Sequence, residues 1–297
     1  MPRRLDRDFP STAEEGIIIS GHNFHNENID RRIYTRVIFE YCLFSNIGMK
    51  DAEFSFCVFK HCEFSDCYLV YTKFRNCDFS WCEFIDTKLD YTKYWRCAPV
   101  LAQVTNAKPS DPQSASKFFR NLAIEHKNLG NWDEVDRFIA ESYRERERHY
   151  KYAFCGENDH YRRRYGGFKR WRYFGRYLSL RLSRIVWGYG VSWGILLRSA
   201  LLLWALILPV ANLEFGKITN LKTPSLGIDP IDNILQYVGI LYKSTTQAFM
   251  PFIPVNVVDA PENFILPYWL VFTESAMGLI FLALFASMIF RTITKGM

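Results

Sequence analysis

Cysteine is the residue type whose abundance could support metal or redox chemistry, because the 297-residue chain contains eight cysteines. A zinc site or a redox motif needs thiols two to four residues apart, and the chain has no CxxC pair. Seven cysteines instead share one phase of a five-residue period: Cys42, Cys57, Cys62, Cys67, Cys77, Cys82 and Cys97. A strict period indicates a repeated structural position, so the sequence predicts neither a metal site nor disulfides.

The other residues that could do chemistry are scattered along the chain. No nucleophile–base motif or phosphate loop is visible, and the histidines show no ligand spacing: His22, His25, His61, His126, His149 and His160. The sequence therefore predicts no enzymatic activity and no cofactor. The composition, with 49% hydrophobic residues and only 16 Gly and 12 Pro, excludes a disordered or collagen-like chain.

A second phase of the same period carries large apolar residues at fifteen consecutive positions. These are Phe24, Ile29, Tyr34, Phe39, Phe44, Met49, Phe54, Phe59, Phe64, Leu69, Phe74, Phe79, Phe84, Leu89 and Tyr94. Two residues before them stand small side chains, mainly Cys, Thr and Ala, and most other positions are polar. Neither a helix nor a strand has a period of five, so the pattern predicts a solenoid with these residues inside.

The repeats resemble the pentapeptide-repeat family over about residues 22–98, as in Cys62-Glu63-Phe64-Ser65-Asp66. The resemblance implies a right-handed quadrilateral β-helix in residues 22–100, with one pentapeptide per side, after an N-terminal cap segment at residues 1–21. His22, Glu27 and Arg32 occupy the small position, so we expect a distorted first coil. Such a solenoid offers faces for an unidentified cytosolic ligand or protein.

The resemblance raises a further possibility, because some members of the family imitate DNA and act on topoisomerases. That function requires a strongly acidic surface. From Gly21 to Val100 the chain has eleven acidic and ten basic residues. The near neutrality argues against DNA mimicry.

A change of period marks the next segment. Residues 107–114, with two Pro, two Ser and one Asp, have the composition of a linker. Helical spacing then predicts a hairpin over residues 114–152, with a stop at Gly130-Asn131. The hairpin resembles one tetratricopeptide-like unit, which implies a peptide-docking or assembly element. The alternative is a spacer between the solenoid and the membrane, and we favour the spacer, because single helical repeats seldom bind alone.

Residues 162–184 carry nine basic side chains and no acidic one, interleaved with aromatic residues. Basic and aromatic residues together could bind RNA. The segment adjoins an apolar stretch, however, and this favours an interfacial helix at residues 160–186 on the cytosolic face of a membrane, without nucleic acid. The basic residues assigned to this interface are Arg162, Arg163, Arg164, Lys169, Arg170, Arg172 and Arg176.

Two stretches are long and apolar enough to cross a bilayer as helices. We expect one span at about residues 191–213 and a second at about residues 264–290. Between them lie three lysines, against nine basic residues before the first span, which predicts that both termini are cytosolic. The absence of an N-terminal signal peptide agrees with this topology, and we expect a multi-pass protein of the plasma membrane, the inner membrane in a bacterium.

The connection between the spans contains another helix, at about residues 230–246, which Asp229 caps and Pro230 begins. Residues 187–297 thus resemble the two-transmembrane potassium-channel-like family, with a re-entrant pore helix. The resemblance rests on Gly188-Tyr189-Gly190, on Tyr242-Lys243-Ser244-Thr245-Thr246 and on Thr273-Glu274-Ser275-Ala276-Met277-Gly278-Leu279. It implies a homo-oligomer, with a tetramer favoured, and a filter formed by Ser244, Thr245, Thr246, Gln247, Ala248, Phe249 and Met250.

The filter departs from the family pattern because it lacks the two glycines that let carbonyl groups face the ion. We therefore expect weak selectivity among monovalent cations. Glu274 is the sole acidic residue of a span. It either supports the pore together with Gly278 or faces water near the outer surface.

The sequence as a whole predicts a multidomain membrane protein that acts as an oligomeric, weakly selective cation channel. Its cytosolic repeats would gate or assemble the pore. The alternative is a membrane-tethered interaction scaffold with a degenerate, non-conducting pore. Bilayer conductance separates the two functions.

Overall fold

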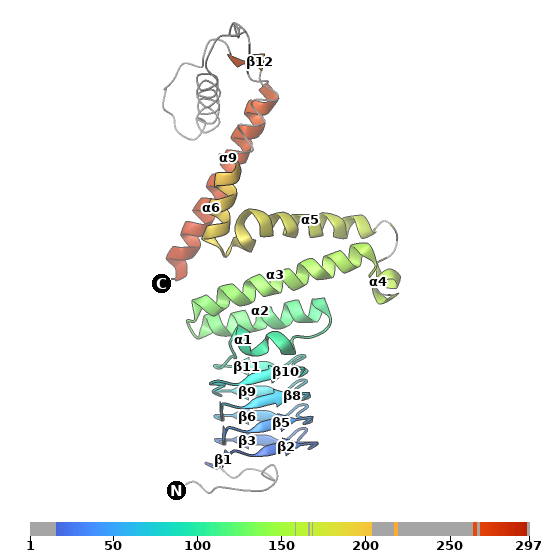
Figure 1. Cartoon of the computed structure of the whole chain (residues 1–297), viewed down its shortest axis with the longest axis vertical. Helices are drawn as coiled ribbons and strands as arrows, with labels where there is room; N and C mark the ends of the chain where they lie inside the picture. The colour runs from blue at the N-terminus through green and yellow to red at the C-terminus, as the bar shows by residue number, and fades with distance from the viewer. Residues whose placement is uncertain are drawn as a thin grey trace, which may run out of the picture. The chain divides into compact units, whose positions relative to one another are not determined.

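The computed structural model describes residues 16–157, 159–165, 167, 169–203, 217–218, 264–265 and 268–295. The chain divides into two compact units, Met1–Arg181 and Leu182–Met297. The first contains a β-solenoid followed by helices, and the second contains an apolar helix pair (Figure 1).

The solenoid is built from parallel strands of three residues each. They are β1 (Ile18–Ser20), β2 (Asn23–His25), β3 (Ile33–Thr35), β4 (Ile38–Glu40), β5 (Leu43–Ser45), β6 (Glu53–Ser55), β7 (Val58–Lys60), β8 (Glu63–Ser65), β9 (Lys73–Arg75), β10 (Glu83–Ile85) and β11 (Lys93–Trp95). Three faces carry the sheets β1-β4-β7, β2-β5-β8-β10 and β3-β6-β9-β11. Single bridges such as Gly48↔Tyr68 form the fourth face.

The register between neighbouring coils is twenty residues, as in Phe44↔Phe64 and Phe64↔Phe84. Four pentapeptides therefore complete one coil, and equivalent positions stack on each other. All fifteen large residues of the repeat are buried, which confirms the interior predicted from the period. Phe44 and Phe64 stack with ring centroids 4.6 Å apart.

From Asn26 to Arg96, the corners of the solenoid contain non-glycine residues with positive φ at five-residue intervals, and Gly21 occupies the corner before them. This left-handed conformation is unfavourable for most L-residues, although Asn and Asp tolerate it. Hydrogen bonds to the next coil hold the corners, for example from the His61 N–H to the Ser80 carbonyl at 3.0 Å. The left-handed corners turn the chain through the angle that separates one face from the next.

The first coil is regular, so the expected distortion is wrong. β1 pairs with β4 in the common register, and Ile17 and Ile19 are buried, so the solenoid begins before residue 22. His22, Glu27 and Arg32 are only half-buried. They belong to the first coil, where polar side chains at the small position retain access to water.

Helices close the other end of the solenoid (Figure 1). They are α1 (Leu101–Val104), the short 3₁₀ helix η1 (Thr105–Ala107), α2 (Pro112–Asn128) and α3 (Trp132–Cys155). Phe118, Phe119 and Phe138 belong to the same hydrophobic core as the repeat residues. The α2–α3 hairpin is therefore packed as a cap on the last coil, and its role as a spacer stays a prediction.

The segment before α2 is also packed, which corrects its interpretation as a linker. Ala107 is buried, and the Lys108 ammonium lies 2.8 Å from the Glu145 carboxylate of α3. Asp111 then begins α2, because its side chain accepts a hydrogen bond from the Ser114 N–H at 2.9 Å, and Pro112 occupies the first helical position.

The basic segment forms two helices where we expected one at residues 160–186. These are α4 (Asp159–Arg164) and α5 (Lys169–Trp187), and Gly167 between them has a positive φ of 69°. A glycine in this conformation ends helical geometry.

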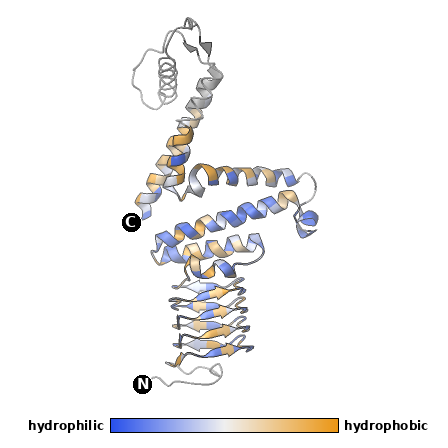
Figure 2. Ribbon diagram, in the orientation of Figure 1, coloured by the Kyte–Doolittle hydropathy of each residue, from blue (hydrophilic) through white to orange (hydrophobic). Residues whose placement is uncertain are grey.

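The second unit contains η2 (Gly188–Gly190), α6 (Trp193–Leu202), α9 (Tyr268–Lys295) and the antiparallel pair β12 (Lys217–Ile218) and β13 (Phe264–Ile265). Among the described residues, one helix, α9, is long and apolar enough to cross a membrane. It begins later and ends later than the span expected at residues 264–290. Figure 2 shows α6 and the coloured part of α9 as mainly hydrophobic.

Candidate functional site

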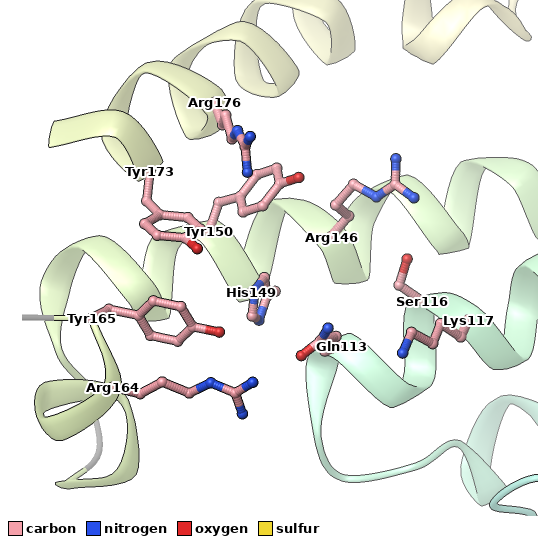
Figure 3. Close-up of a pocket in the computed structure, with 10 residues that line it drawn as sticks. All are labelled: Gln113, Ser116, Lys117, Arg146, His149, Tyr150, Arg164, Tyr165, Tyr173 and Arg176. Carbon is pink, nitrogen blue, oxygen red and sulfur yellow. The ribbon is translucent and has the colours of Figure 1, made fainter. Parts of the chain in front are cut away.

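A cleft of about 660 Å³ lies among the helices that follow the solenoid (Figure 3). We call it the basic cleft. Four cationic side chains, three tyrosines, a histidine and two neutral polar residues line it: Lys117, Arg146, Arg164, Arg176, Tyr150, Tyr165, Tyr173, His149, Gln113 and Ser116. No carboxylate is among these lining residues.

Helical spacing brings these side chains together. α2 contributes Gln113, Ser116 and Lys117, and α3 contributes Arg146, His149 and Tyr150, each set spaced three and four residues apart. Residues with this spacing share one helix face. Arg164 and Tyr165 come from the end of α4, and Tyr173 and Arg176 lie one turn apart on α5.

A hydrogen-bonded chain connects the cleft to the start of α2. His149 is 7% exposed, and its Nδ1 lies 3.0 Å from the Tyr161 hydroxyl. That hydroxyl donates to the Asp111 carboxylate at 3.3 Å. Because the single hydroxyl proton is directed at Asp111, the His149 Nδ1 is assigned as the protonated nitrogen that donates to Tyr161.

The electrostatic environment favours the neutral form of His149. Burial lowers its pKa, the Asp111 carboxylate opposes this, and the nearby charges of Arg164 and Arg146 lower the pKa further. Burial also raises the pKa of the Tyr161 hydroxyl, and the neighbouring Asp111 carboxylate adds to the rise. Both groups are therefore uncharged at neutral pH.

Tyrosine rings position the arginines of the cleft. The Arg176 guanidinium lies 5.8 Å from the Tyr150 ring centroid and 5.7 Å from that of Tyr173. The Arg164 guanidinium lies 5.9 Å from the Tyr165 ring. Cation–π contacts of this kind orient a guanidinium without neutralising its charge.

The basic residues assigned to a membrane interface have different surroundings. Arg164 and Arg176 line the cleft, whereas Arg163 and Arg172 are exposed outside it. Arg162 donates to the Gly156 carbonyl at 2.8 Å, and the Arg170 Nε is buried without a hydrogen bond in the described structure. The structure does not describe the side chain of Lys169. Contact of this segment with lipid stays a prediction.

Sequence reasoning missed Lys117, Arg146 and His149 as members of a site. Each lies in the hairpin that we interpreted as a spacer. The three-residue spacing of Arg146 and His149 indicated a shared helix face. Nothing in the spacing indicated that α4 and α5 lie opposite that face.

The filter residues expected at positions 244–250 lie outside the described residues. Glu274 and Gly278 both lie within α9, and the side chain of Glu274 is outside the description. No group of three or more potential metal ligands occurs in the described part of the chain. The seven repeat cysteines are buried free thiols.

The helices of the second unit run antiparallel and contact at one end. The Trp193 ring at the start of α6 lies 6.2 Å from the Phe285 ring, and its Nε1 donates to the Thr292 hydroxyl at 3.2 Å. The Arg291 guanidinium donates to the Gly190 carbonyl. The beginning of α6 and the end of α9 therefore lie together.

Comparison with known proteins identifies a family for the repeat region but not for the rest of the chain. Residues 37–105 match the family described as "Pentapeptide repeat region". No curated protein matches the chain.

Similar solved structures include a trypsin-treated variant and the full-length form of QnrB1, a plasmid-mediated fluoroquinolone resistance protein. The trypsin-treated form is 19% identical over 31% of this chain and 58% of its own, with a TM-score of 0.14. The full-length form is 18% identical over 30% and 55%, with a TM-score of 0.12. The chain spans little more than half of these proteins. With the twenty-residue register, the family match shows that the chain carries a pentapeptide-repeat region folded as a β-solenoid.

Proposed function

We propose that the protein is a membrane-embedded, homo-oligomeric channel for monovalent cations, and that its pentapeptide-repeat region lies in the cytosol and gates or assembles the pore. The observation that carries the proposal is the apolar surface of α9. The resemblance of residues 187–297 to two-transmembrane channels supplies the architecture.

The length and surface of α9 suit a bilayer. At 28 residues, the helix is about 42 Å long, more than the ~30 Å hydrocarbon core. Six apolar side chains between Leu279 and Ile293 are more than half exposed: Leu279, Ile280, Leu282, Ile289, Phe290 and Ile293. A helix in water rarely leaves so much contiguous apolar surface uncovered, so lipid or other copies of the chain are the expected surroundings.

The contact between α6 and α9 supports two spans. A chain that enters the membrane through α6 and returns through α9 has the start of α6 and the end of α9 on the same side. Trp193 and Thr292 meet in this way. Arg291 lies at the same end, where a cytosolic flank requires positive charge.

The proposed filter predicts weak selectivity. Thr245, Thr246 and Gln247 offer hydroxyl and amide oxygens at the end of the helix that the sequence predicts to begin at Asp229. The negative end of a helix dipole favours cations over anions. Side-chain oxygens hold less fixed positions than a ring of carbonyl groups, so potassium and sodium should permeate with a ratio within about tenfold, or ~1.4 kcal/mol.

Single-channel recording from the full chain in planar bilayers tests the proposal. We expect cation current, with Thr246→Ala changing the conductance or the reversal potential. Thr219→Ala is the matched control, because the proposal assigns Thr219 to the loop before the predicted pore helix and not to the filter. Strong potassium selectivity or chloride preference would show that the filter is misplaced.

A membrane-tethered scaffold is the second candidate, and the solenoid surface favours it. Tyr41, His61 and Trp81 stack along one corner, with ring centroids 4.8 and 6.0 Å apart, and Trp81 is 76% exposed. Exposed aromatic residues are typical of protein interfaces. A silent bilayer under every applied voltage and ligand would favour this function over the channel.

A further inference from the structure

We propose that the basic cleft binds a small ligand bearing phosphate groups. The proposal does not depend on the channel, because the cleft lies within the first unit. The phosphate could belong to a soluble phosphorylated molecule or to a lipid whose headgroup ends in a phosphomonoester, and both present a dianionic phosphate.

The first argument is the uncompensated charge. Lys117, Arg146, Arg164 and Arg176 line one cleft, and no carboxylate lies within ion-pair distance of any of them in the described structure. Four like charges around one space repel each other unless an anion enters.

Neighbouring arginines show that the chain pairs its cations elsewhere. On α3, Arg144 pairs with Glu141, and Arg148 lies 3.1 Å from Glu145. Arg181 of α5 lies 3.2 Å from Glu147. Arg146, between these pairs on α3, faces the cleft instead. The positive charge of Arg146 is therefore left unneutralised at the cleft, where a ligand can reach it.

The second argument is the arrangement of donors. The guanidinium groups of Arg164 and Arg176 are held against tyrosine rings, and a positioned guanidinium binds phosphate oxygens through two parallel N–H groups. Ser116, His149 and Tyr165 are buried and add polar groups to the wall. Several donors on different sides suit the tetrahedral oxygens of phosphate better than a planar carboxylate.

The size of the cleft limits the ligand. About 660 Å³ falls within the usual range of small-molecule sites, roughly 300–1,000 Å³. Inorganic phosphate alone would leave most of this volume to water. The cleft therefore suits a ligand that carries either more than one phosphate or a phosphate and an organic group, and the three tyrosine rings offer apolar contact to the organic part.

Isothermal titration calorimetry of the full chain in detergent tests the site. One arm uses inorganic pyrophosphate and ATP without metal, and the other uses dihexanoyl phosphatidic acid below its micellar concentration. Dihexanoyl phosphatidylcholine is the control, because it lacks the dianionic group. We expect saturable binding of one probe molecule per chain in at least one arm, and the arm that binds identifies the source of the phosphate.

Matched double variants separate the cleft from diffuse charge. Arg164→Gln with Arg176→Gln should weaken binding at least tenfold. Arg163→Gln with Arg172→Gln removes the same charge from the same two helices outside the cleft, and should leave affinity within about twofold. Arg146→Gln provides a second test from α3, and unchanged thermal melts verify folding. Equal weakening by both double variants, or no binding of any phosphate probe, would overturn the proposal.

Discussion

Phe64 lies between Phe44 and Phe84 in a column of rings that runs through the solenoid interior, with centroids 4.6 and 4.8 Å apart. The side chain is fully buried. Its neighbours are fixed by strand pairing in the coils on either side, so they cannot close over an empty site.

We expect Phe64→Ala to lower the free energy of unfolding by about 3–5 kcal/mol, the usual effect of removing a packed aromatic ring. Urea unfolding of the full chain measures the change. Phe56→Ala is the control, because Phe56 is 55% exposed at a corner. This change should lower the free energy of unfolding much less. Similar effects at the two positions would contradict the packed column.

The repeat cysteines do more than fill small positions. The Cys67 thiol donates to the Phe44 carbonyl at 3.2 Å, and the Thr72 hydroxyl makes the equivalent bond to Met49 at 2.7 Å. Burial raises the pKa of the Cys67 thiol to about 11, so it stays protonated and can donate at neutral pH. The sequence showed a small residue here but did not reveal the hydrogen bond.

Cys67→Thr should therefore change the free energy of unfolding by less than about 1 kcal/mol, because a hydroxyl can replace the thiol donor. Cys67→Leu should destabilise by about 1–3 kcal/mol through overpacking. Thermal melts measure both, and a chelator should leave the wild-type melt unchanged. A chelator-induced fall in melting temperature would show that the thiols hold a metal.

At the scale of elements, Asp111 connects the cap to the cleft. Its carboxylate accepts hydrogen bonds from the Ser114 N–H at 2.9 Å and from the Tyr161 hydroxyl at 3.3 Å. Partial burial raises the pKa of Asp111, but the hydrogen bonds from Ser114 and Tyr161 outweigh this effect and hold the pKa below its ordinary value of 3.8. The ionised form is the one that stabilises the fold.

We expect Asp111→Ala to lower stability by about 0.5–2 kcal/mol through loss of the helix cap. Asp111→Asn keeps the cap but cannot titrate. Because the folded-state pKa is lowered, the carboxylate stabilises fully above about pH 4 and loses this effect as the pH falls through 3.8 towards the lowered value. Melts from pH 7 to pH 3 should therefore show a larger decline in the wild type than in Asp111→Asn, and parallel curves would contradict this role.

The solenoid could be predicted because its period alone specifies which residues lie inside, as with Phe24 through Tyr94. The cap could not, since helical spacing marks Phe119 and Phe138 as apolar but does not say which surface they cover. The cleft was also missed. Its cations come from four helices, and only the tertiary fold brings Lys117 and Arg176 to one space.

At the scale of the whole molecule, charge asymmetry and helix pairing bear on the same question of orientation. Nine basic residues precede the first apolar stretch, whereas three lysines follow it before the second. The Trp193–Thr292 hydrogen bond brings the start of α6 to the end of α9. Positive flanks remain in the cytosol, so the start of α6 and the end of α9 should both lie on the cytosolic side.

We therefore expect reporters fused to either terminus to be cytosolic, and an epitope inserted within residues 219–228 to be labelled from outside intact cells. An epitope at Gly130 is the matched control. That loop between α2 and α3 has open space around it and should be labelled only after permeabilisation, because we expect the first unit to lie in the cytosol. If the 219–228 epitope is protected in intact cells and labelled after permeabilisation, these residues lie in the cytosol and the two-span topology is wrong. The termini then distinguish the alternatives. With one crossing the termini lie on opposite sides, and with no crossing every epitope lies inside.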